Sequence, residues 1–127
     1  MSVLDASAVL ALLNDEPGAE SVARHLEGGA SISSVNYAEV VSKLSDYGMP
    51  ADAIQDALAG LGLQVAPFTE DQARICGYLR VPTREAGLSL GDRACLALAT
   101  VDGAVAVTAD RGWSGLAGIA VEIELVR

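Results

Sequence analysis

The sequence has very few of the side chains that nucleophilic and thiolate-based enzymes use. It contains one histidine, His25, and two cysteines, Cys76 and Cys95, which lie far apart. Neither cysteine has a second cysteine or a histidine at a spacing typical of zinc ligands, so we exclude a thiolate metal site and expect both in the core. His25 falls on a predicted surface helix and should be solvated. This argues against Ser-His-Asp or Cys-His catalysis.

Long hydrophobic runs are also missing. Just over half of the residues are hydrophobic, but the longest runs, such as residues 94–99, are far shorter than the roughly 20 residues of a membrane span. The first residues carry neither the basic start nor the length of a secretory signal. We therefore expect a cytoplasmic protein without a membrane partner, and the length of 127 residues fits a single domain over 1–127.

Basic residues are scarce, with 8 Lys and Arg against 17 Asp and Glu and a formal net charge of −9. Such acidity lowers the expectation of a nucleic-acid substrate, because phosphate binding usually requires a basic face. However, Arg80, Arg84, Arg93 and Arg111 all lie in the second half of the chain, and bound divalent ions would offset part of the acidic charge. The composition is thus compatible with a nucleic-acid substrate.

Four carboxylates stand out by their positions. Asp5 directly follows the first predicted strand, and Asp110 comes just after a clearly buried one. Glu39 and Asp92 fall in the first turns of two predicted helices. Asp5 is the hardest to explain otherwise, because an acid at the end of a buried strand is desolvated and no basic residue lies near it in sequence. Oxygen ligands of this kind suit Mg²⁺ or Mn²⁺, whose charge would offset the mutual repulsion of the four acids.

Apolar periodicity alternates between strand and helix, which favours a parallel sheet covered on both faces. The predicted strands are 3–4, 30–33, 64–66, 104–107 and 121–125, and the predicted helices are 7–14, 19–27, 35–46, 51–60, 69–79 and 90–101. In such folds ligands bind at the carboxyl ends of the strands. We expect Asp5 and Asp110 at that edge, with Glu39 and Asp92 facing the same crevice.

Three of the acids also have a local structural interpretation. Glu39 stands three residues after Asn36, which matches a helix capping box. Asp92 stands three residues after Ser89, so it could stabilise a helix start. Asp110 could simply close a turn through its own backbone. A metal site is favoured because all of these local explanations would otherwise have to hold at once.

The segments around the four acids together resemble a known family. They are Leu4–Ala8 (LDASA), Ser34–Val40 (SVNYAEV), Leu88–Ala99 (LSLGDRACLALA) and Val107–Trp113 (VTADRGW). In this order they are similar to PIN-domain ribonucleases, and especially to the compact VapC-like toxins of toxin–antitoxin pairs. The resemblance implies a Rossmann-like three-layer α/β/α sandwich around a parallel central sheet of about five strands.

The resemblance also implies the roles of the site residues. Asp5, Glu39, Asp92 and Asp110 would be the catalytic and metal-binding acids, holding Mg²⁺ or Mn²⁺. The metal would activate water for RNA hydrolysis, leaving a 5′-phosphate and a 3′-hydroxyl. Supporting positions, each with a local structural alternative, are the hydroxyl residues Ser7 and Thr108 and the arginines Arg93 and Arg111, which either contact RNA or balance charge.

Three partners follow from the same resemblance. One is the RNA substrate, and another is a small cognate antitoxin that inserts an arginine into the acidic pocket. Apolar residues of the antitoxin would dock around Leu10, Leu13 and the Val40–Leu44 face. The third is a second copy of the chain, in a homodimer formed by the helices between Val35 and Leu61.

Other functions fit less well. A phosphatase with an aspartyl nucleophile needs a second Asp two residues later, where this chain has Ser7. A receiver domain needs a lysine after a late strand, and the only lysine is Lys43. The alternatives left open are a non-catalytic PIN-like binding module and a housekeeping PIN nuclease without a toxin role.

Overall fold

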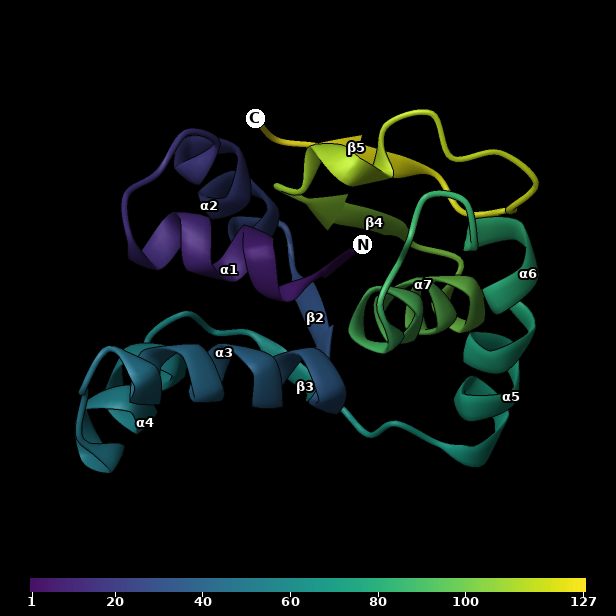
Figure 1. The fold of residues 1–127 in the computed structure, drawn as a ribbon. Coiled ribbons are helices and arrows are strands. Elements are labelled where there is room, and N and C mark those ends of the chain that lie inside the picture. Colours follow the sequence, from purple (N-terminus) through teal and green to yellow (C-terminus); the bar gives the residue numbers. More distant parts are fainter.

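A single parallel sheet organises the computed structural model, which describes all 127 residues (Figure 1). Its strands are β1 (Ser2–Leu4), β2 (Ala30–Ser33), β3 (Gln64–Ala66), β4 (Val105–Thr108) and β5 (Ile123–Leu125). They lie in the order β3-β2-β1-β4-β5, and every neighbouring pair is parallel. The chain therefore reverses its direction of winding between β1 and β4, the kind of position at which open α/β sheets bind ligands.

Helices cover both faces of the sheet (Figure 1). They are α1 (Ala6–Leu13), α2 (Ala19–Glu27), α3 (Ser34–Asp46), α4 (Ala51–Ala59), α5 (Glu70–Tyr78), α6 (Arg80–Thr83) and α7 (Leu90–Asp102), with the short 3₁₀ helix η1 (Arg111–Trp113). Leu4 and Val107 pack under α1–α4, whereas Val3 and Ala106 pack under α7. Successive residues of a strand point to opposite faces of the sheet, so a strand buried between two cores is apolar at consecutive positions, as residues 105–107 of β4 are. The predicted α/β sandwich is confirmed. No helix is both long and apolar enough to span a bilayer.

The starts of α5 and α7 follow the predicted capping signals. Thr69 caps α5 by accepting a hydrogen bond from the Gln72 amide, and Ser89 caps α7 by accepting one from the Asp92 amide. The sequence prediction missed α6 and η1. Pro82 argues against a helix beyond Leu79, but proline is tolerated in the first turn of a short helix, where its missing N–H has no partner to lose.

The prediction that His25 is solvated is wrong. Its Nδ1 lies 3.1 Å from the Ser2 hydroxyl and its Nε2 lies 2.7 Å from the Glu124 carboxylate. Only 22% of the side chain is exposed. The imidazole thus links α2 to β1 and β5, a contact that sequence position alone does not indicate. Both cysteines are free and buried, as expected.

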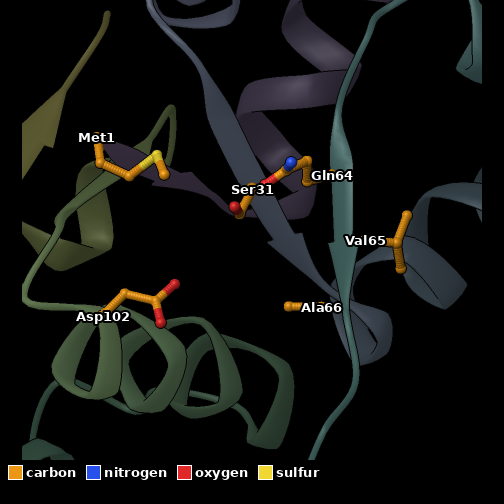
Figure 2. Close-up of a pocket in the computed structure, with 6 residues that line it drawn as sticks. All are labelled: Met1, Ser31, Gln64, Val65, Ala66 and Asp102. Carbon is orange, nitrogen blue, oxygen red and sulfur yellow. The ribbon is translucent and has the colours of Figure 1, made fainter.

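A hollow of about 690 Å³ lies along β3, beside Ser31 of β2 and the carboxyl end of α7 (Figure 2). It is lined by Met1, Ser31, Gln64, Val65, Ala66 and Asp102. Asp102 ends α7 and has the only charged side chain among them. Because the acids singled out above follow the carboxyl ends of β1 and β4 or begin α7, this hollow is separate from the candidate site.

Candidate active site

Asp5 occupies the junction between β1 and α1. Its amide donates to the Val107 carbonyl at 3.1 Å, which extends the pairing of β1 with β4 by one residue. Its carboxylate then caps α1, with Oδ1 accepting from the Ala8 amide at 2.8 Å. The residue is only 3% exposed. Strand pairing and helix capping therefore hold one carboxylate at the point where β1 and β4 end, where it is almost inaccessible to solvent.

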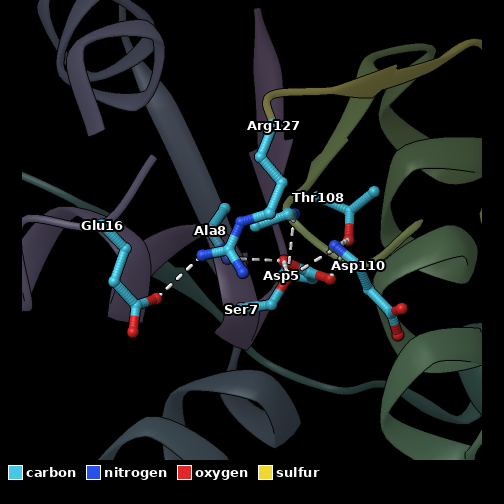
Figure 3. Close-up of polar contacts among 8 residues, drawn as sticks. Asp5, Ser7, Ala8, Glu16, Thr108, Asp110 and Arg127 are labelled. Carbon is cyan, nitrogen blue, oxygen red and sulfur yellow. Dashed lines mark hydrogen bonds and ion pairs between the residues drawn. The ribbon is translucent and has the colours of Figure 1, made fainter. Parts of the chain in front are cut away.

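Two hydroxyl groups connect Asp5 to the loop that follows β4 (Figure 3). Ser7 Oγ donates to Asp5 Oδ1 at 2.8 Å, and Thr108 Oγ1 donates to Asp5 Oδ2 at 2.5 Å. Ser7 Oγ accepts from the Ala109 amide at 2.9 Å, and Thr108 Oγ1 accepts from the Asp110 amide at 3.0 Å. Thus the two hydroxyl residues singled out in the sequence orient the buried acid and also hold the backbone that carries Asp110.

Burial raises the pKa of Asp5 from its ordinary value of 3.8 to about 6. Hydrogen bonds from Thr108, Ala8 and Ser7 oppose this shift, whereas the charge of Asp92 adds to it. None of the ion pairs in the protein involves Asp5, Glu39, Asp92 or Asp110. The ionised form of Asp5 therefore has hydrogen-bond donors but no cation to offset its desolvation.

Glu39 is held against the first turn of α7. Asn36, 1% exposed, donates from Nδ2 to Glu39 Oε1 at 2.8 Å and to the Gly91 carbonyl at 2.9 Å. A Cβ on Gly91 would lie 2.5 Å from either carboxylate oxygen of Glu39, so a larger residue there would displace this carboxylate from its position. Asn36 does not cap α3, as the capping-box interpretation required, because Ser33 occupies that position and accepts from the Val35 amide.

Asp92 and Asp110 both form the local hydrogen bonds that the sequence suggested, at a helix start and in a turn. Asp92 Oδ2 accepts from the Ser89 amide at 2.9 Å and completes a capping box. Asp110 Oδ1 accepts from the Gly112 amide at 2.8 Å. Each interaction occupies one carboxylate oxygen and leaves the second without a protein partner. A structural role and a ligand role are therefore compatible for both residues.

The thiol of Cys95 is buried within electrostatic range of three of the acids. Cys95 on α7 is fully buried, which raises the pKa of its thiol well above the ordinary value, and the charges of Asp5, Asp92 and Glu39 raise it further. As the side chains stand, no three acids lie close enough together to hold a single ion. The structure thus gathers the acids at one edge without closing them into a coordination shell.

The family model of the PIN domain matches residues 2–119. The chain belongs to the PIN-domain family. No significantly similar sequence is found among curated proteins.

Solved structures similar to this PIN domain include toxin–antitoxin proteins. A toxin–antitoxin complex from Klebsiella pneumoniae contains a chain with 20% identity and a TM-score of 0.74, and the match covers 100% of this chain and 98% of that one. A VapBC complex of Rickettsia felis bound to a promoter DNA fragment matches with 18% identity and a TM-score of 0.75, over 99% and 98%. A sarcin–ricin loop cleaving VapC toxin of Mycobacterium tuberculosis matches with 18% identity and a TM-score of 0.68, over 94% and 98%. At these identities the likeness shows the fold.

The arginines of this PIN domain differ in their surroundings. Arg93 Nη1 donates to the Cys76 carbonyl at 3.0 Å, so its guanidinium contacts α5. Arg111 is exposed and forms no ion pair. Sequence reasoning missed Arg127, which donates from Nη2 to Glu16 Oε1 at 2.8 Å and lines the same hollow as Asp110. It also missed the Asn36–Gly91 contact. No local signal marks either feature, because both depend on which elements become neighbours.

Proposed function

We propose that this PIN domain is a Mg²⁺- or Mn²⁺-dependent endoribonuclease that acts as the toxin of a toxin–antitoxin pair. The observation that carries the proposal is the buried Asp5 carboxylate. Two hydroxyls and a backbone amide hold it in place, and it has no cationic partner. A carboxylate desolvated to this extent is costly for a fold unless a bound cation compensates it.

The available donors fit a hard divalent cation. Asp5, Glu39, Asp92 and Asp110 offer only carboxylate oxygens, and all but Asp5 keep one oxygen free of protein hydrogen bonds. Glu39 and Asp110 are exposed. Each accepts one hydrogen bond, from Asn36 and from the Gly112 amide, so a shift toward a shared ion would disturb only that contact. When bound, the metal would lower the pKa of an attacking water and offset charge on the phosphate.

The protein itself orients the carboxylates. Ser7 and Thr108 restrain both oxygens of Asp5, and Asn36 holds Glu39 against the first turn of α7. No histidine is needed for proton transfer, since His25 is engaged with Ser2 and Glu124 in another part of the sheet. Positioned carboxylates and an activated water are sufficient for phosphodiester hydrolysis in this scheme.

The toxin role rests on likeness over nearly the whole chain to proteins solved as toxin–antitoxin complexes. An acidic pocket is also a suitable receptor for an antitoxin arginine. The expected docking groove needs one correction. Val40 and Leu44 are 0% and 3% exposed and belong to the core, so they do not line a surface groove. Leu10 and Leu13 of α1 are partly exposed and stay in the proposed contact.

The proposal includes a homodimer through α3 and α4. Ile54 and Leu58 are core residues and are not available to a partner, but Tyr47 is 59% exposed, and Met49 and Leu61 are partly exposed. Light scattering at micromolar concentration should give twice the monomer mass. A monomeric mass would contradict the dimer without affecting the nuclease assignment.

The direct test of the enzyme is incubation of the purified protein with total RNA in Mg²⁺ or Mn²⁺ and in EDTA. The cut ends are then mapped. Cleavage that requires metal and leaves 5′-phosphate ends is expected, and the Asp5→Asn protein prepared in parallel controls for a contaminating nuclease. RNA binding without cleavage would instead indicate a non-catalytic module.

A further inference from the structure

A second hollow, of about 610 Å³, adjoins the acidic edge. It is lined by Ser7, Pro17, Ala109, Asp110, Arg111 and Arg127. Figure 3 shows the Arg127 side chain extending from the end of β5 toward Glu16 and Ser7. Ser7 and Asp110 belong both to this hollow and to the network around Asp5. Any ligand in the hollow is therefore next to the candidate active site.

Three contacts position Arg127 there. The Val126 amide donates to the Thr108 carbonyl at 2.9 Å, which carries the end of β5 to the same edge as the end of β4. The turn before α2 packs closely against this segment, since a Cβ on Gly18 would lie 2.6 Å from the Val126 carbonyl oxygen. Glu16 from the same turn then holds the Arg127 guanidinium, whose side chain is still 30% exposed.

This hollow contains two arginines in a protein of net charge −9. The Arg111 and Arg127 guanidinium groups line it together with the Asp110 carboxylate, and Glu16 pairs with Arg127. The neighbouring hollow beside α2 is lined by Asp15, Glu16 and Glu20 against the single Arg24. Arg111 has no ion-pair partner, and Arg127 uses one nitrogen on Glu16. Donors for an anion thus remain available on both arginines.

We propose that this hollow binds a backbone phosphate of the RNA substrate, next to the phosphodiester that is cut. The inference rests on the proposed ribonuclease function and extends it to a defined phosphate subsite. Arginine forks bind phosphate oxygens through charge-assisted hydrogen bonds. Such contacts set the register of the nucleic acid without reading its bases. Arg127 and Arg111 are therefore positioning residues, whose loss weakens RNA binding and leaves the acids in place.

The first experiment measures binding of a fluorescent single-stranded RNA oligonucleotide, in EDTA, over a series of salt concentrations. Arg127→Gln and Arg111→Gln should each weaken binding roughly three- to tenfold, and each should reduce the slope of log affinity against log salt by about 0.7. Arg74→Gln is the matched control. It removes the same charge from α5, where Arg74 is half-exposed and pairs with Glu70 and Asp71, and it should leave the slope unchanged.

A second measurement locates the phosphate. Single phosphates of the oligonucleotide are replaced in turn by uncharged methylphosphonates, and binding to each protein is compared. One position should weaken binding to the wild-type protein and have no effect on the Arg127→Gln, Arg111→Gln double variant. Arg127→Lys, which keeps the charge but loses the fork, should give an intermediate affinity and provides the same comparison if the double variant does not fold.

The outcomes separate this inference from the ribonuclease proposal. Wild-type affinity and salt slope in both single variants would overturn the subsite, even if the protein cleaves RNA. So would variants that lose binding of a cognate antitoxin peptide while they keep RNA binding, since the hollow would then be an antitoxin site. If the methylphosphonate effect depends on the arginines and no metal condition gives cleavage, the subsite stands and the nuclease assignment fails.

Discussion

Thr108 donates a 2.5 Å hydrogen bond to Asp5 across a sequence separation of 103 residues. This contact joins the ends of β1 and β4, the strands between which the winding of the sheet reverses. Thr108 is 0% exposed and Asp5 is 3% exposed, so the hydrogen bond is formed away from water. The candidate site is thus built around one buried, oriented carboxylate. The role of this carboxylate can be tested by substitution and by the pH dependence of stability and activity.

Replacing Asp5 with Asn should abolish metal-dependent RNA cleavage while the fold is kept, because one ligand charge is lost and no core volume is emptied. In EDTA the variant should be at least as stable as the wild type, since the desolvated charge is gone. Cleavage assays and urea unfolding check the two parts separately. Undiminished cleavage by pure Asp5→Asn protein would falsify the site assignment.

Stability without metal should depend on pH through Asp5. Its folded-state pKa of about 6 lies above the ordinary 3.8, so the folded protein binds this proton more tightly than the unfolded chain. The free energy of unfolding should therefore fall as pH rises from about 4 to 6, by up to about 3 kcal/mol. The difference between Asp5→Asn and wild type in urea should grow over the same range. A difference independent of pH would contradict the raised pKa.

Thr108→Val removes the hydroxyl with little change in shape. The carboxylate then loses its strongest stabilising hydrogen bond, so the pKa of Asp5 should rise further and metal binding at neutral pH should weaken, with a cost of about 1.5–3 kcal/mol. The acidic limb of the pH–rate profile should move to higher pH, and Thr108→Ser should restore it. A purely structural role would lower stability in Thr108→Val without moving the pH limb.

Gly91→Ala tests whether the position of the Glu39 carboxylate against α7 matters for metal binding. The added Cβ would lie 2.5 Å from the carboxylate oxygens, so Glu39 must move away from α7 and Mn²⁺ affinity measured by calorimetry should fall roughly tenfold or more. Gly77→Ala is the matched control, because Gly77 lies in α5 and an added Cβ there would meet nothing within 4 Å. That control should gain about 1 kcal/mol of stability from helix propensity and keep its metal affinity.

The toxin role makes a prediction about growth. Expression of the wild-type chain in its own host should arrest growth, Asp5→Asn should be harmless, and co-expression of an adjacent small gene encoding the antitoxin should relieve the arrest. Leu13→Glu places a charge in the proposed apolar contact on α1 and should weaken antitoxin binding while cleavage is retained. A chain that cleaves RNA in that host without slowing growth would favour a housekeeping nuclease.

The sequence by itself determined the features whose causes are local. Alternating apolar periods predicted the layers, Thr69 and Ser89 marked helix starts through hydrogen bonds from backbone amides three residues later to their hydroxyls, and an acid directly after a buried strand marked Asp5 as the candidate site. These signals involve residues a few positions apart, so they can be read without knowing the neighbours of each element.

Only the tertiary structure decided which elements become neighbours. The placement of β5 beside β4 brings Arg127 to the acidic edge, and the packing of α3 on α7 turns Asn36 from a predicted cap into a link between Glu39 and Gly91. The prediction for His25 was wrong for the same reason, because its partners Ser2 and Glu124 lie on other elements. Strand order and helix packing arise from burial of whole faces, and no short stretch of sequence carries that information.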